Sequence, residues 1–220
     1  MAILNINWHG FDFERGLSIL DQSLSAATGA LELNRAAVQK QWDDYEAAVA
    51  AGAPEDVEWD DDIKVWDRGM AYENDLHMIQ DAHGVMRKAH VIALYHLWER
   101  VVRGWTKAPA SADHKRLRKL VEAKGIKVHP RLEAIRDLNN ALKHNSEKSG
   151  PELLGSWPEL FSDEFKSGIA ERLDKARTDP QRPMIDWFEA IRINDGQMAE
   201  VVLALRTSGP VGGITNDADA

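Results

Sequence analysis

The sequence predicts an all-α protein: a helical bundle with short peripheral helices and a disordered tail over residues 208–220. Two stretches, residues 91–105 and 131–144, carry apolar residues at the three- and four-residue spacing of a helix that buries one face. The chain has no internal repeat, and no strand–helix–strand alternation predicts a parallel sheet. A single helical domain over residues 1–207 is therefore expected.

Glycine, proline and polar runs divide the rest of the chain into further helices. The segments with helical spacing are residues 13–27, 31–51, 63–107, 113–124, 163–177, 184–193 and 197–206. Gly52 and Pro54 end the second of these, and an acidic loop over residues 55–62 follows. Gly84 weakens the longest segment, so we expect either two helices or one bent helix there. Residues 2–8 alternate weakly and predict a short strand or an extended arm.

The helix expected over residues 131–144 is the most informative part of the chain. The residues that share its apolar face are Leu132, Ile135, Leu138 and Leu142. The residues that share its polar face are Arg136, Asn140, Lys143 and His144. Pro130 stands where a first helical turn accepts proline, and Gly150-Pro151 closes the helical region before a loop. The segment therefore buries one side and presents a guanidinium, an amide, an ammonium and an imidazole on the other.

The two segments with the best-defined apolar faces are residues 63–107 and 130–148. We expect them to pack antiparallel at the centre of the bundle, because each needs an apolar surface to cover its own. In this arrangement the Trp98 side of the longer helix meets Leu138 and Leu142.

Composition restricts the class of protein. The chain has 220 residues and no cysteine, which excludes disulfides and thiolate metal sites and fits a reducing cytoplasm. The first eight residues lack the basic start and long apolar core of a signal peptide. No run approaches the roughly 18 apolar residues of a membrane helix. We therefore expect a cytoplasmic protein without membrane contact.

The net charge of −9 conceals two blocks of opposite sign. Residues 42–75 contain 12 acidic and 2 basic side chains, whereas residues 87–148 contain 15 basic and 6 acidic ones. One interpretation is two solvated helix faces without a specific partner. The other is that the basic block faces phosphate, while the acidic block faces away or docks on the basic block of a neighbour.

The polar face around His144 has the groups needed to hold a phosphodiester. A guanidinium binds phosphate bidentately, and an imidazole can transfer a proton near neutral pH. An RNA strand carries its own nucleophile in the 2′-hydroxyl, so this chemistry needs no metal. The alternative is an ordinary solvent-exposed helix face.

The stretch Arg136-Asp-Leu-Asn-Asn-Ala-Leu-Lys-His144 follows a long helix with Tyr95-His-Leu-Trp-Glu-Arg100, and together they resemble the HEPN superfamily. The family motif is an arginine and a polar residue, followed after a few residues by a histidine. Seven residues separate Arg136 from His144, more than is usual in the family, and Asn140 is placed to share or replace the role of the arginine. The resemblance covers about residues 86–150.

The resemblance implies a small helical bundle that works as a homodimer in bacterial toxin–antitoxin or phage-defence systems. It implies RNA binding or metal-independent RNA cleavage, with Arg136, Asn140 and His144 as the catalytic residues. The substrate-binding residues expected beside them are Lys143, Arg100 and Arg103. The expected partners are RNA and an antitoxin or defence-system protein. The alternative is a non-catalytic interaction or sensor subunit of a larger complex, which burial of the polar face would favour.

A metal site is a third alternative. Glu73 and His77 stand one helical turn apart, and His83 and His90 share a heptad face, as ligands in a four-helix bundle do. Such bundles usually add several carboxylates at ligand spacing, and the chain has no Glu-x-x-His pair. We therefore expect neither a metal nor a cofactor.

Overall fold

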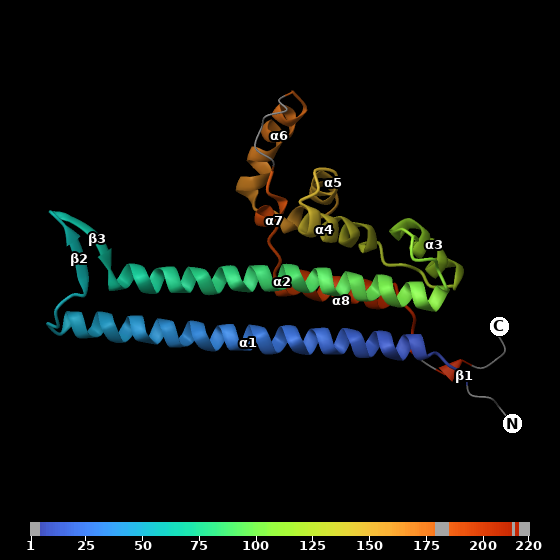
Figure 1. The fold of residues 1–220 in the computed structure, drawn as a ribbon, viewed down its shortest axis with the longest axis horizontal. Helices are drawn as coiled ribbons and strands as arrows, with labels where there is room; N and C mark the ends of the chain where they lie inside the picture. Colours follow the sequence, from blue (N-terminus) through green and yellow to red (C-terminus); the bar gives the residue numbers. More distant parts are fainter. Residues whose placement is uncertain (1–4, 179–184, 213, 216–220) are drawn as a thin grey trace. The chain divides into compact units, whose positions relative to one another are not determined.

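The computed structural model describes residues 5–178, 185–212 and 214–215, and these residues are mostly α-helical, as expected (Figure 1). In chain order the elements are β1 (Asn5–Ile6), α1 (Trp8–Ala50), β2 (Val57–Asp60), β3 (Ile63–Asp67), α2 (Arg68–Thr106), α3 (His114–Ala123), α4 (Leu132–His144), α5 (Ser149–Ser156), the 3₁₀-helix η1 (Pro158–Leu160), α6 (Asp163–Thr178), α7 (Trp187–Ala190), α8 (Asp195–Thr207) and β4 (Ile214–Thr215). None of the described helices combines the length and apolar character needed to cross a bilayer.

The chain divides into two compact units, and α1 and α2 contribute residues to both. The larger unit comprises Met1–Asp21 and Arg87–Ala220, and the smaller one comprises Gln22–Met86.

The larger unit has a core of bulky side chains from helices far apart in the sequence. Its fully buried members include Phe13, Leu17, Leu94, Trp98, Leu138, Leu153, Trp157 and Trp187. Within this unit α4 lies against α5, α7 and α8. Leu142 is buried as well, so all three side chains expected at the centre of the bundle are enclosed. The antiparallel packing of α2 on α4, with Trp98 against Leu138 and Leu142, stays a prediction.

Part of the segment expected as a tail lies in this core. Ser208 is fully buried, and its carbonyl oxygen accepts a 2.7 Å hydrogen bond from the indole Nε1 of Trp98. The Ser208 hydroxyl accepts a second bond, from the backbone N–H of His129. Further on, β4 pairs antiparallel with β1. Residue 213 and residues 216–220 lie outside the described residues.

Two expected helices, over residues 13–27 and 31–51, form the single helix α1. Gly29 does not interrupt it, because one exposed glycine costs a helix only about 1 kcal/mol relative to alanine and leaves its backbone hydrogen bonds intact. Helix α2 likewise continues through Gly84 without a break. The expected division at Gly29 was therefore wrong, and so was the alternative of two helices divided near Gly84, whereas a bend in a single helix there stays a prediction.

The expected acidic loop and the start of the next expected helix form a β-hairpin instead. Strands β2 and β3 pair antiparallel, and Asp61 takes a positive φ of 52° at the turn between them. Aspartate tolerates this left-handed conformation better than most residues. Ile63, Lys64 and Val65 alternate between apolar and charged side chains, which is the period of a strand, and Trp66 interrupts this alternation.

The loop expected after His144 contains the helix α5. Its Gly150 packs directly on the indole of Trp187, and a Cβ at this position would lie 2.1 Å from the ring. This contact joins segments far apart in the chain, which explains why local sequence did not predict the helix. Residues 185–193 are helical only over α7, which is shorter than expected.

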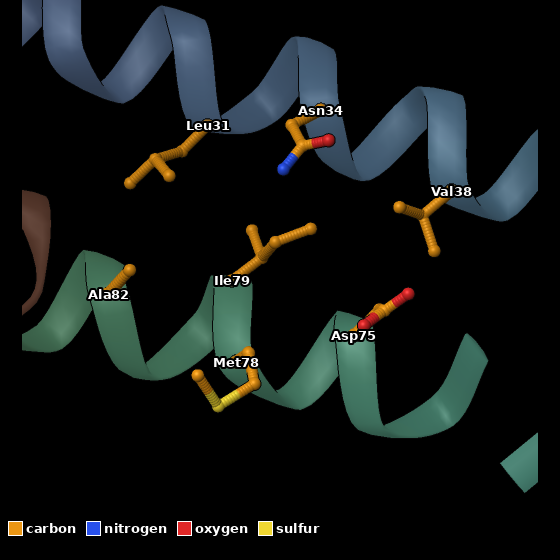
Figure 2. A pocket seen from close by; sticks show the side chains of 7 residues that line it. All are labelled: Leu31, Asn34, Val38, Asp75, Met78, Ile79 and Ala82. Atoms are coloured by element: carbon orange, nitrogen blue, oxygen red, sulfur yellow. The ribbon is translucent and has the colours of Figure 1, made fainter. Parts of the chain in front are cut away.

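The smaller unit consists of the last part of α1 and the first part of α2, antiparallel and joined by the β2–β3 hairpin (Figure 1). Its buried side chains are Ile79 and His83 alone. Near the hairpin, Tyr72 contacts the rings of Trp42 and Tyr45. Between the two helices runs a groove of about 400 Å³ (Figure 2).

Candidate functional site

Helix α4 has well-defined ends that place its polar side chains. Its first turn carries Glu133, and its last turn carries Lys143 and His144, so charges at both ends complement the helix dipole. Asn145 ends the helix in the left-handed conformation at φ 47°. The side-chain oxygen of Asn145 also accepts a 2.7 Å hydrogen bond from the backbone N–H of Trp187. The end of α4 is therefore held by the helix packed beside it.

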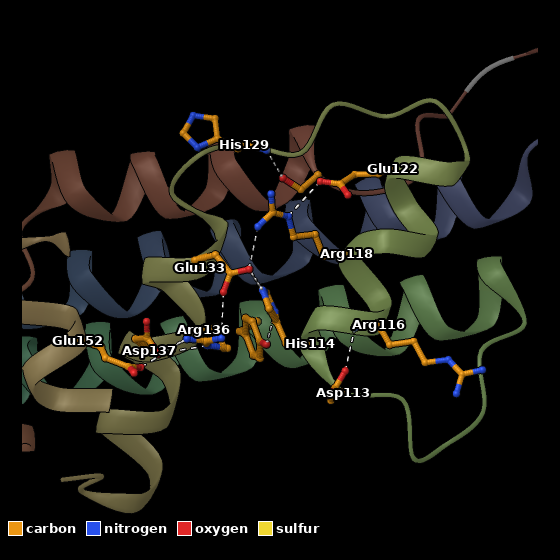
Figure 3. A network of polar contacts seen from close by, with 12 residues as sticks. Asp113, His114, Arg116, Arg118, Glu122, His129, Glu133, Arg136, Asp137 and Glu152 are labelled. Atoms are coloured by element: carbon orange, nitrogen blue, oxygen red, sulfur yellow. Dashed lines mark hydrogen bonds and ion pairs between the residues drawn. The ribbon is translucent and has the colours of Figure 1, made fainter. Parts of the chain in front are cut away.

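The guanidinium of Arg136 is surrounded by carboxylates (Figure 3). Its Nη2 and Nε lie 2.7 and 3.1 Å from one oxygen of Asp137, and its Nη1 lies 2.9 Å from Glu133. Glu152 of α5 lies 3.6 Å away. Asp137 is itself buried, whereas Arg136 is half-buried. Three negative charges therefore face one positive charge, and the group expected to bind phosphate is already bound.

These contacts extend into a larger network that joins four helices. Glu133 accepts a 3.0 Å hydrogen bond from Arg118 of α3, and its carboxylate lies 3.4 Å from Nε2 of the buried His114. Nδ1 of His114 shares a 2.8 Å hydrogen bond with the hydroxyl of Tyr95 on α2. We call this set the carboxylate–arginine cluster; its members are Tyr95, His114, Arg118, Glu133, Arg136, Asp137 and Glu152. The cluster ties α2, α3, α4 and α5 together.

Burial controls the protonation of the interior members of the cluster. It lowers the pKa of His114, although the negative charge of Glu133 acts in the opposite direction. It raises the pKa of Tyr95 above its ordinary value and also raises the pKa of Asp137, against the hydrogen bond from Arg136. At neutral pH the phenol and the imidazole are therefore both uncharged, a state suited to a buried hydrogen bond.

The lowered pKa of His114 predicts a loss of stability in mild acid. Below its ordinary pKa of 6.5, the unfolded chain takes up a proton that the folded chain does not, so the free energy of unfolding falls as pH falls. The His114→Gln variant removes this titration and keeps a hydrogen-bonding group for Tyr95. Between pH 7 and 5 its melting temperature should fall less steeply than that of the wild type; equal slopes would contradict the assignment.

Arg136 is not joined by Asn140 and His144, the other expected catalytic residues, or by Lys143, which was expected to bind substrate. Asn140 is half-buried, and its side-chain oxygen lies 3.4 Å from the amide nitrogen of Asn139. Lys143 and His144 are exposed at the end of α4. At about 1.5 Å of rise per residue, eight positions place His144 about 12 Å along the helix from Arg136. The structure thus separates an enclosed arginine from an exposed histidine.

Arg100 and Arg103 lie on α2 and line a different feature. They border a hollow of about 510 Å³ between α1 and α2, together with His96. Arg103 donates to Glu99 and to the carbonyl of Ala112, and it is half-buried. No residue of α4 lines this hollow in the part of the chain that the structure describes. The expected substrate-binding residues therefore fall on two surfaces.

The histidines of the metal alternative lie apart. His77 lies 3.9 Å from Glu73, and His83 lies 3.4 Å from Glu32, all in the smaller unit. His90 belongs to the larger unit. Among the described residues, no three histidine or carboxylate side chains are grouped to hold a metal ion.

Sequence reasoning missed the partners of Arg136. Glu133 precedes it by three positions, so helical spacing alone could have indicated this contact. Asp137 follows it directly, and adjacent residues of a helix do not face each other, so spacing gave no signal for this one. Glu152, the third partner, comes from another helix and left no signal in local sequence. The same holds for His114 and Tyr95, which join the cluster through Glu133 and not through Arg136.

Comparison of the chain with family models, curated proteins and solved structures finds no match.

Proposed function

We propose that the chain is a non-catalytic module of HEPN type that binds a partner protein, and that Arg136 is structural. The enclosure of Arg136 by Asp137, Glu133 and Glu152 carries this proposal. A phosphate anion would have to displace hydrogen-bonded carboxylates and approach their negative charges. Withdrawal of Arg136 would also leave the buried Asp137 without its counter-ion, which is costly.

The proposal predicts that the purified protein leaves RNA intact. Structured and single-stranded RNAs incubated with micromolar protein, with and without EDTA, should show no strand breaks above a blank on denaturing gels. The His144→Ala variant is the matched control, because His144 is exposed and its removal should not affect folding. Breaks made by the wild type and lost in this variant would contradict a non-catalytic role.

A second candidate function is RNA binding or metal-independent RNA cleavage at the end of α4. Exposure of Lys143 and His144 on one helix turn favours it, because a cation and an imidazole there are open to a phosphate. In this case His144→Ala should reduce cleavage by about 100-fold, and EDTA should have no effect. The products should carry 2′,3′-cyclic phosphates, and DNA should survive. An antitoxin or defence-system protein would then be the partner.

Either function is compatible with a two-fold dimer, the assembly that the HEPN resemblance implies. Pairing would use the larger unit, because that unit holds α4. Light scattering at micromolar concentration should return about twice the chain mass of 24.7 kDa. A mass of one chain over the whole concentration range would contradict the dimer.

A further inference from the structure

The smaller unit, Gln22–Met86, has too little core for the apolar surface that it carries. Ile79 and His83 are its only buried side chains. Its large apolar side chains that remain exposed are Leu33, Trp59, Ile63, Val65, Met70, Met78 and Val85. Two antiparallel helices bury only one stripe each against the other, and bundles are usually completed by further helices. An additional helix would cover part of this surface.

The groove between the two helices is the place where such a helix would fit. Its walls are Leu31, Asn34 and Val38 on α1 and Asp75, Met78, Ile79 and Ala82 on α2 (Figure 2). Leu31 and Val38 are seven residues apart, as are Asp75 and Ala82. This is the repeat at which one helix presents side chains to another. Met78 adds an adaptable side chain, of the kind that lines many helix-binding grooves.

The charge of the unit determines the kind of helix. Gln22–Met86 contains 14 acidic and 4 basic side chains, a net charge of −10. The same unit of a second copy, a nucleic acid and an anionic membrane would all be repelled. A helix with lysines and arginines beside its apolar face would be attracted. Asp75 supplies a carboxylate on the wall of the groove itself.

We propose that the groove between α1 and α2 in Gln22–Met86 binds a basic amphipathic helix of a partner protein. This inference rests on the proposed function, since it names the surface and the chemistry by which the module would bind its partner. The apolar face of the incoming helix covers Leu31, Val38 and Met78, and its cations flank Asp75. Helix-in-groove recognition combines these two contributions.

The test uses the full chain and a fluorescent 18-residue amphipathic peptide of leucine and lysine as the probe. Two peptides serve as controls: one replaces lysine with glutamate, and the other has the same composition in a scrambled, non-amphipathic order. Fluorescence anisotropy should show saturable binding of the leucine–lysine peptide, at least tenfold tighter than either control. Hydrogen exchange should show protection of residues 31–38 and 75–82 on binding. Equal binding of the scrambled peptide would overturn the proposal.

Matched variants separate groove binding from general attraction to an acidic protein. Met78 lines the groove and is 63% exposed, whereas Leu33 is 75% exposed and does not line it. Met78→Lys and Leu33→Lys change the charge equally, and circular dichroism checks their folding. Met78→Lys should weaken peptide binding at least tenfold and Leu33→Lys less than threefold; equal losses would overturn the groove as the site.

The remaining outcomes also decide between occupants. Self-association of the chain that Met78→Lys abolishes, and with which the peptide does not compete, would show that a second copy occupies the groove. The proposal would then be wrong. RNA cleavage by the wild type would refute the proposed non-catalytic function but would leave the peptide result unchanged. Failure of peptide binding with intact RNA would refute this inference alone.

Discussion

Replacing Arg136 with alanine should lower the free energy of unfolding by about 2 kcal/mol. Removal of one partner from a buried ion pair costs about 3–5 kcal/mol, and the partial exposure of Arg136 reduces this figure through solvent screening. The cost arises because Asp137 is buried and would lose both hydrogen bonds to the guanidinium. Urea unfolding followed by tryptophan fluorescence measures the change.

The matched control is Lys143→Ala on the same helix. Lys143 is exposed, so its removal should change the free energy of unfolding by no more than about 0.5 kcal/mol. If Arg136→Ala were as harmless as Lys143→Ala, the cluster would not stabilise the fold, and Arg136 would be available for a ligand.

Gly150→Ala should also be strongly destabilising, by about 1–3 kcal/mol or more. The added methyl group would lie 2.1 Å from the Trp187 ring, which is almost fully buried. Either the ring or α5 must shift, and the contact between segments far apart in sequence is lost. Thermal unfolding followed by circular dichroism measures the effect.

Gly155 provides a control in the same helix with the opposite expected sign. A Cβ at Gly155 would meet nothing within 4 Å, so Gly155→Ala should stabilise the protein by about 0.5–1 kcal/mol through its better helix propensity. Similar effects of the two substitutions would contradict the packing of Trp187 on α5.

Local sequence predicted the helices whose ends and apolar faces agree. Asp113 caps α3 through a hydrogen bond from the backbone N–H of Arg116. Asn194 forms a capping box with Gln197 at the start of α8, which begins two residues before the helix expected over residues 197–206. In each cap the residue that accepts the hydrogen bond and the residue that donates it are three positions apart, so the cap can be recognised from sequence without a structure. The position of α4 followed in the same way from its apolar spacing.

The elements that sequence did not predict depend on distant contacts or on weak signals. Helix α5 is short and lies on Trp187, which is far from it in the chain. The β2–β3 hairpin was hidden by its acidic composition, and its alternation of apolar and charged residues is limited to Ile63, Lys64 and Val65. Helix α1 is continuous through Gly29 because the regular helical sequence on both sides of it outweighs the cost of about 1 kcal/mol for one glycine.

The polar face of α4 was predicted as a unit, but the structure divides it. Sequence placed Arg136 and His144 on the same helix, which is correct. It did not show that Asp137, next to the arginine, lies inside the protein and binds it. The third carboxylate, Glu152, reaches the guanidinium only because α5 packs on α4, and this packing has no local signature.

A double-mutant cycle between Arg136 and Asp137 tests the structural role of Arg136 most directly. The free energy of unfolding is measured in urea for the wild type, Arg136→Met, Asp137→Asn and the double variant. Each substitution removes a charge with little change in volume. We expect a coupling energy of about 1–3 kcal/mol between the two side chains. A coupling near zero, with Arg136→Met as stable as the wild type, would contradict a structural arginine.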